Sequence, residues 1–137
     1  MIKDTKNKDR RKFLPCRAVF LDRVDGRTSL RRGKYPERAQ KRTLNSAAKL
    51  GLDYQPGPIL WFEDDEAADA VLSRTLYIIS KAGIEIEREH HIPYVRNSLT
   101  VLERTLRHAA HVSGCKIIPR EEAATWRGFV NARAVRG

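Results

Sequence analysis

Hydrophobic and polar residues follow two different periods along this chain, and the first clear pattern is that of a β-hairpin. Residues 17–24 are rich in strand-forming side chains, and residues 27–30 have the same character. Asp25-Gly26 lies between these two runs, and this dipeptide suits a two-residue hairpin turn because both positions tolerate a positive φ. We therefore predict a β-hairpin over residues 16–31.

A helical pattern follows the hairpin. Residues 37–50 have helical spacing, and Pro36 suits the first position of a helix because its missing N–H costs nothing there. Gly51 supplies a C-terminal stop. The proline- and glycine-rich residues 53–58 predict a loop, which is also the one internal boundary that the composition supports.

The second half of the chain alternates between strand and helix patterns. Residues 59–62 form a short apolar run that predicts a strand, and the acidic residues 63–66 favour the start of a helix that runs to about residue 82. Residues 84–87 alternate strictly between apolar and acidic side chains, which predicts a second strand. This order favours one βαβ unit with a right-handed crossover.

Two further helices complete the expected fold. Asn97 or Ser98 can cap a helix over residues 98–112, and residues 119–132 predict a last helix. Residues 115–118 are a third strand candidate between them. The predicted class is α+β, with an N-terminal basic β-hairpin and helix followed by a small βαβ-containing core with two further helices.

Composition changes this picture only in its domain organisation. The chain has 137 residues, of which 41% are hydrophobic, so one domain with a real core is expected. We predict a basic disordered tail over residues 1–14 and a single domain over 15–137, with its basic part at 15–52 and its α/β core at 58–137. We expect no signal peptide, no membrane span and no disulfide framework, hence a cytoplasmic protein.

Charge is the feature that points to function. Residues 1–50 hold sixteen Lys and Arg against five Asp and Glu, a net charge of +11, whereas residues 51–100 carry −5 and residues 101–137 carry +4. A chain that concentrates positive charge in this way usually binds a polyanion. We therefore predict a nucleic-acid partner, with double-stranded DNA as the first choice.

The candidate contact residues lie in the hairpin, in the link after it and on the first helix. They are Arg17, Arg23, Arg27, Arg31, Arg32, Lys34, Arg38, Lys41, Arg42, Asn45 and Lys49. Helical spacing places positions 38, 42, 45 and 49 on one face, where Arg and Asn are the residue types that recognise guanine and adenine edges. Positions 31, 32 and 34 are expected to contact phosphates. The competing interpretation is an ordinary solvated charged face.

A second basic stripe lies on the helix at 98–112. Its members are Arg104, Arg107, His108 and His111, with Arg96 just before the helix. This stripe is either a second phosphate-contacting surface or the solvent side of an amphipathic helix.

Histidines supply the only pattern that suggests catalysis. The stretch Glu89-His90-His91-Ile92-Pro93, followed by Asn97, Leu99 and a later histidine, resembles the HNH (ββα-metal) nuclease motif. In that family a histidine activates water and a metal holds the scissile phosphate. The resemblance implies a metal-dependent nuclease that uses His90, His91, His108 and His111.

The competing interpretation of the histidines is structural, and it is the one we predict. His90 and His91 would lie in a loop at a strand end, while His108 and His111 would be exposed helix residues. Cys115, which follows them, adds a ligand type that suits zinc. We nevertheless expect no catalytic residue, no metal and no cofactor.

The sequence as a whole therefore predicts a DNA-binding protein, either a transcriptional regulator or an accessory factor. It is more consistent with a non-enzymatic role than with an enzyme. A metal-dependent nuclease and an RNA-binding or ribonucleoprotein component remain the rival classes. A homodimer through the apolar C-terminal residues Trp126, Phe129 and Val130 is a further expectation.

Overall fold

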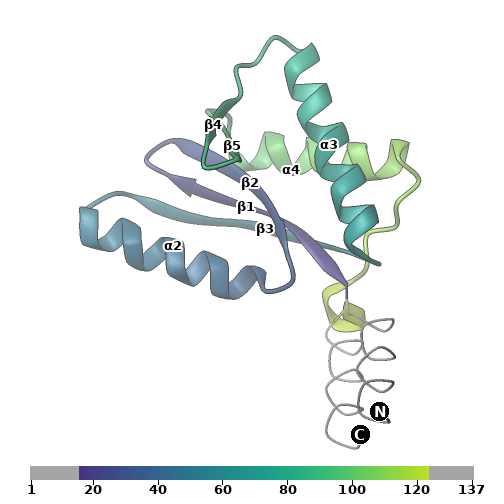
Figure 1. Ribbon diagram of the computed structural model, residues 1–137, viewed down its shortest axis with the longest axis horizontal. Coiled ribbons are helices and arrows are strands. Elements are labelled where there is room, and N and C mark those ends of the chain that lie inside the picture. The colour runs from purple at the N-terminus through teal and green to yellow at the C-terminus, as the bar shows by residue number, and fades with distance from the viewer. Residues whose placement is uncertain (1–15, 124–137) are drawn as a thin grey trace, which may run out of the picture.

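Five antiparallel strands form one open sheet, with helices on both of its faces (Figure 1). The structure is a computed structural model that describes residues 16–123. In chain order its elements are β1 (Arg17–Val24), β2 (Arg27–Gly33), α2 (Pro36–Leu50), β3 (Tyr54–Phe62), α3 (Asp65–Lys81), β4 (Glu87–Glu89), β5 (Ile92–Val95) and α4 (Leu99–Val112). The order of strands across the sheet is β3-β1-β2-β5-β4. The α+β class is therefore confirmed.

The first hairpin forms as predicted. Asp25 and Gly26 have φ angles of 50° and 81°, and a two-residue turn with positive φ at both positions matches the twist of the strands that it joins. The turn sets the register of β1 against β2, in which Leu21 lies opposite Leu30 and Phe20 lies opposite Arg31.

Strand β1 is buried on both faces because it lies inside the sheet between two helical layers. Val19 and Leu21 belong to the larger core, which is shared with α3 and α4. Ala18 and Phe20 point to the other face and join a smaller core with Trp61, on the side of α2. This two-sided burial explains the unbroken apolar run in the sequence.

The helices begin and end at residues with the expected capping chemistry. Pro36 is the first residue of α2, and Gly51 ends that helix with a φ of 69°. The side chains of Asp64 and Ser98 each accept a hydrogen bond from the backbone N–H three residues on, at 2.8 and 3.3 Å. Each cap satisfies a donor that the first turn of a helix leaves without a partner.

The predicted loop over residues 53–58 is wrong, because β3 begins at Tyr54 and runs to Phe62. Pro56 and Pro58 suggested a loop, since proline cannot donate to a sheet. Strand β3 tolerates both because it lies at the edge of the sheet, where β1 is its one neighbour among the named strands of the described residues. The predicted strand over 59–62 is therefore the second half of a longer one.

A β-bulge interrupts the pairing of β3 with β1. Gly57 and Pro58 together oppose the single residue Leu21. A Cβ on Gly57 would lie 2.4 Å from the backbone oxygen of Leu21, so no other residue fits there. The side-chain amide of Gln40 donates to the carbonyl oxygens of both Leu21 and Gly57 at 3.1 Å. This contact ties α2 to the point where the sheet is irregular.

The second predicted strand, over residues 84–87, is also wrong. Residues 84–86 form no strand, and the chain instead makes a short hairpin from β4 and β5. His90 and His91 are its turn residues, with φ angles of 51° and 67°. Strand β5 then pairs with β2, which joins this hairpin to the sheet.

The prediction of a βαβ unit is wrong, because the two strands that α3 connects are not neighbours in the sheet. Strands β3 and β4, which α3 connects, lie at opposite edges of the sheet, and each named pair of strands is antiparallel. Of the strand candidate over 115–118, only Ile118 pairs, in an isolated bridge with Trp61. The tail at 1–14 and most of the helix expected at 119–132 lie outside the described residues.

Candidate nucleic-acid interface

Helix α2 lies over β1 and β3 on one face of the sheet, while α3 and α4 cover the opposite face (Figure 1). Its inward side is short and weakly apolar. Pro36 and Ala47 are buried, and Gln40 and Thr43 are half-buried. Because so little of α2 is buried, most of its circumference faces solvent.

The solvent side of α2 carries the cations that the sequence placed there. Exposed side chains on it are Arg38, Lys41, Arg42, Asn45 and Lys49. At 3.6 residues per turn these five positions fall within an arc of about 100°, opposite the buried face. Within the described residues none of the four cations makes an ion pair. Their charged groups therefore face solvent without a neighbouring acid to balance them.

The start of α2 adds one aromatic ring to this charged surface. Tyr35 is 48% exposed. The ammonium nitrogen of Lys34 lies 5.8 Å from the centre of its ring, and the guanidinium of Arg38 lies 5.3 Å from it. From residue 34 to residue 50 the chain has five Lys and Arg against the single acid Glu37. We call this surface, residues 34, 38, 41, 42, 45 and 49, the α2 basic face.

The hairpin arginines are in a different situation, because the fold brings acids to most of them. Arg32 forms an ion pair with Asp65 and lies 3.5 Å from Asp69. The Nε of Arg17 lies 3.7 Å from the same Asp65. Asp65 and Asp69 lie in the first turns of α3, so two predicted contact residues have their charge balanced by the acidic start of that helix.

Arg27 is held by the β4–β5 hairpin. Its guanidinium donates to Glu87 at 3.2 Å and to Glu89 at 2.5 Å, and it stacks on the ring of Tyr94 at 4.3 Å from the ring centre. The hydrogen bond to Glu89 raises the pKa of Arg27, and the same bond lowers the pKa of Glu89. Glu87 also accepts a hydrogen bond from Arg96.

Arg31 belongs to a polar network between β1, β2 and α2. It forms an ion pair with Asp22, which is 1% exposed, and donates to the hydroxyl of Thr43 at 3.0 Å. Tyr54 donates to the other carboxylate oxygen of Asp22 at 2.6 Å. Burial, followed by this hydrogen bond, raises the pKa of Tyr54 well above its ordinary value. Arg31 therefore holds α2 against the sheet.

Arg23 is occupied as well, although by backbone rather than by an acid. Its guanidinium donates to the carbonyl oxygen of Asn97 and to the hydroxyl of Thr28. The predicted contact residues thus divide into two groups. Those in the hairpin support the fold, whereas those from Lys34 onward remain available to a partner.

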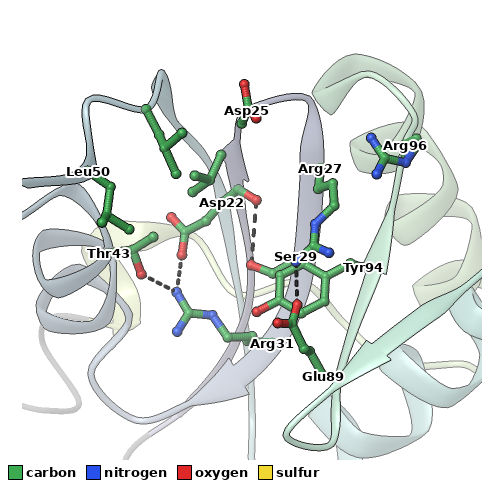
Figure 2. Close-up of a pocket in the computed structure, with 12 residues that line it drawn as sticks. Asp22, Asp25, Arg27, Ser29, Arg31, Thr43, Leu50, Glu89, Tyr94 and Arg96 are labelled. Carbon is green, nitrogen blue, oxygen red and sulfur yellow. Dashed lines mark hydrogen bonds and ion pairs between the residues drawn. The ribbon is translucent and has the colours of Figure 1, made fainter. Parts of the chain in front are cut away.

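A groove runs beside α2 on the half of the sheet face that α2 leaves uncovered (Figure 2). It has a volume of about 580 Å³ and lies between α2 and the β4–β5 hairpin, with β1 and β2 as its floor. Sequence reasoning missed this groove. The strand that contributes Tyr94 was not predicted, and the sequence signal that could have revealed it is the short run of strand-forming side chains over residues 92–95.

The histidines do not gather into a metal site. His90 and His91 lie in the turn of the β4–β5 hairpin, whereas His108 and His111 are exposed on α4. Over residues 16–123, no group of three or more His, Cys, Asp or Glu side chains could hold a metal ion. Cys115 is half-buried, and its thiol donates to the carbonyl oxygen of Ser113.

The second basic stripe, on α4, lies on the far side of the sheet from α2. Arg104, His108 and His111 are exposed, and Arg107 is paired with Glu103 one helical turn away. The two basic surfaces therefore belong to helices on opposite faces of the sheet.

No helix in the described part of the chain combines the length and the apolar character needed to cross a membrane. Comparison of the chain with protein-family models, with curated proteins and with solved structures finds no match.

Proposed function

We propose that this protein binds nucleic acid through the α2 basic face. The observation that carries the proposal is the contrast between two sets of cations that the sequence alone does not separate. The hairpin arginines are matched with acids or carbonyls of the fold, whereas Arg38, Lys41, Arg42 and Lys49 are exposed and meet no acid in the described part of the chain. Unbalanced charge costs self-repulsion, which a polyanion relieves.

The mechanism is phosphate neutralisation with release of counterions. Positions 38 and 49 are eleven residues apart in the helix, which corresponds to about 16 Å along its axis. This length lets the α2 basic face contact several consecutive phosphates. Asn45, at the centre of the face, is the one uncharged member, and it can donate and accept hydrogen bonds at a base edge.

The direct test compares two triple variants that lose the same charge. The first, R38Q/R42Q/K49Q, alters the α2 basic face. The second, R74Q/R88Q/K116Q, alters exposed cations elsewhere in the fold. Both lower the net charge from +10 to +7. The measurement is the affinity for fluorescent duplex DNA, single-stranded DNA and RNA across a range of salt concentrations.

Only the first variant should reduce the slope of log affinity against log salt, by roughly 0.7–0.9 for each lost phosphate contact. Equal losses in the two variants would show that net charge alone causes binding, and this would contradict the proposal. The three probes also test the preference for duplex DNA over RNA, which remains a prediction.

The finer parts of the expected function also stay predictions. A role as transcriptional regulator or accessory factor and a cytoplasmic location follow only from charge and composition. A homodimer through Trp126, Phe129 and Val130 concerns residues outside the described range. Light scattering of the full chain, with and without DNA, would measure the oligomeric state.

A further inference from the structure

The groove beside α2 has two walls of different electrostatic character (Figure 2). On one side Thr43 and Leu50 of α2 line it. Helical geometry places Arg42 and Lys49 about 100° from these two residues, toward solvent, so both cations follow the rim of the groove. Gln40 reaches toward β3 from the other side of the helix. The side of α2 that carries Thr43 and Leu50 is therefore the side that faces the groove.

The opposite wall is balanced in charge. Arg96 follows β5 in this wall, and Arg27 reaches it from β2 in the floor, but Glu87 and Glu89 accept their hydrogen bonds. A phosphate is therefore attracted to the α2 rim and gains little at the hairpin wall. A strand that follows the α2 rim with its backbone turns its bases toward the groove and the hairpin.

The interior of the groove offers flat and apolar surfaces of the kind that a base requires. Tyr94 lies in this wall with the planar guanidinium of Arg27 stacked on its ring at 4.3 Å. Two carboxylates hold that guanidinium in place, so the stack is ordered before any ligand arrives. Across from it, Leu50 is 73% exposed and Leu52 is 38% exposed. Aromatic rings and guanidinium planes are the usual platforms for unpaired bases.

The floor of the groove offers hydrogen-bond donors that the fold leaves unused. Arg31 makes its contacts with Asp22 and Thr43 through one nitrogen, Nη2. Its Nε is shielded from solvent and cannot reach a ligand. The side chain is nevertheless 22% exposed, and among the described residues no hydrogen bond uses its other terminal nitrogen, Nη1. An arginine with donors to spare suits the oxygen and nitrogen acceptors on the edge of a base.

We propose that this groove receives an unpaired base of a single strand whose phosphates lie along the α2 rim. The inference rests on the proposed function and names its substrate class as single-stranded nucleic acid, or a duplex with a locally unpaired base. A volume of about 580 Å³ lies within the range of about 300–1,000 Å³ that ligand sites occupy. A fully paired duplex keeps its bases stacked and leaves the groove empty.

The test uses two variants in the groove, each with a matched control. Tyr94→Leu removes the ring of the platform, and Tyr77→Leu removes an exposed tyrosine of α3 that also lies under a cation, Lys81. Leu50→Glu obstructs the groove, and Leu44→Glu places the same charge on the same helix at a residue that is 46% exposed and does not line the groove. Because Leu50 is exposed, its variant keeps the test valid if Tyr94→Leu fails to fold.

Affinities are measured by fluorescence anisotropy on single strands of about 12 nucleotides, in DNA and RNA, and on the matching duplexes. A single strand that contains 2-aminopurine reports stacking directly through quenching of its fluorescence. Each groove variant should weaken single-strand binding about tenfold and lower the quenching, since stacking of one base on an aromatic side chain supplies an effect of this size. Tyr77→Leu should bind as the wild type does, because Tyr77 lies on α3 and does not line the groove. Leu44→Glu should lose only the affinity that one added negative charge on α2 costs, and Leu50→Glu should lose about tenfold more than this control.

Two other results would overturn the inference. If the groove variants bind single strands as the wild type does, while R38Q/R42Q/K49Q loses affinity, the groove takes no base and the proposed function stands without it. If the wild type prefers the duplex and the groove variants weaken duplex and single strand equally, α2 contacts paired DNA. Unchanged binding by R38Q/R42Q/K49Q would instead refute the proposed function itself.

Discussion

Asp22 is a buried acid at the point where α2 is attached to the sheet through Arg31. Its replacement by asparagine tests how much this ion pair contributes to stability. Its side chain is 1% exposed. It accepts a hydrogen bond from Tyr54 at 2.6 Å and forms an ion pair with Arg31. Arg31 in turn donates to Thr43 of α2 at 3.0 Å.

Asp22→Asn keeps the shape of the side chain and removes its charge. Loss of one partner from a fully buried ion pair costs about 3–5 kcal/mol, because the other charge stays buried without compensation. The Arg31 side chain is 22% exposed, so water can compensate it in part. We therefore expect the free energy of unfolding to fall by about 2–3 kcal/mol, with a fall of roughly 6–12 °C in Tm for a chain of this size.

The assay is urea unfolding followed by circular dichroism, applied to a double-mutant cycle. Arg31→Met removes the partner and keeps most of its volume. The double variant should be more stable than the sum of the two single losses predicts, by about 1–3 kcal/mol, because neither charge is then left alone. Additive losses, or a loss below about 1 kcal/mol in Asp22→Asn, would refute the role given to this ion pair.

The remaining predictions concern ionisation, packing and capping. Tyr54 should stay protonated well above the pH at which a free tyrosine ionises, near 10, as read from absorbance near 295 nm against Tyr54→Phe. Because its pKa is higher in the folded state, its contribution to stability should be present below that pH and lost as the pH rises above it. Gly57→Ala should cost about 1–3 kcal/mol in urea unfolding, since its Cβ would meet Leu21. Gly33→Ala, which meets only an ordinary contact at 3.8 Å, should be near neutral, and equal costs would contradict the bulge. Asp64→Ala should cost about 1 kcal/mol through loss of the α3 cap, and an unchanged midpoint of unfolding would show that the cap does not matter.

The sequence predicted correctly those turns and helix ends that depend only on residues next to one another in the chain. The Asp25-Gly26 turn, Pro36 at the start of α2 and Gly51 at its end fix their structure through φ angles and missing donors, which depend on neighbours in the chain. The solvent side of α2 was predictable for the same reason. Helical spacing alone places its cations on one face.

Elements that depend on partners distant in sequence were missed. Pro56 and Pro58 are accepted in β3 because that strand lies at an edge, and strand order is a property of the whole sheet. The alternation over residues 84–87 predicted a strand, but the chain pairs from Glu87 onward, where the turn at His90 and His91 brings β5 back against β4.

The pairing of charged side chains is the feature that the sequence alone predicted least well. The sequence by itself determined that the first fifty residues carry a net charge of +11, a concentration of charge that predicts a polyanionic partner. Only the tertiary structure decided which cations remain available. The acids of residues 51–100 fold back onto the hairpin, where Asp65 meets Arg32 and Glu89 meets Arg27. Coulomb energy depends on distance in space rather than along the chain, so a count by segment could not show that the excess charge of the described fold is concentrated on α2.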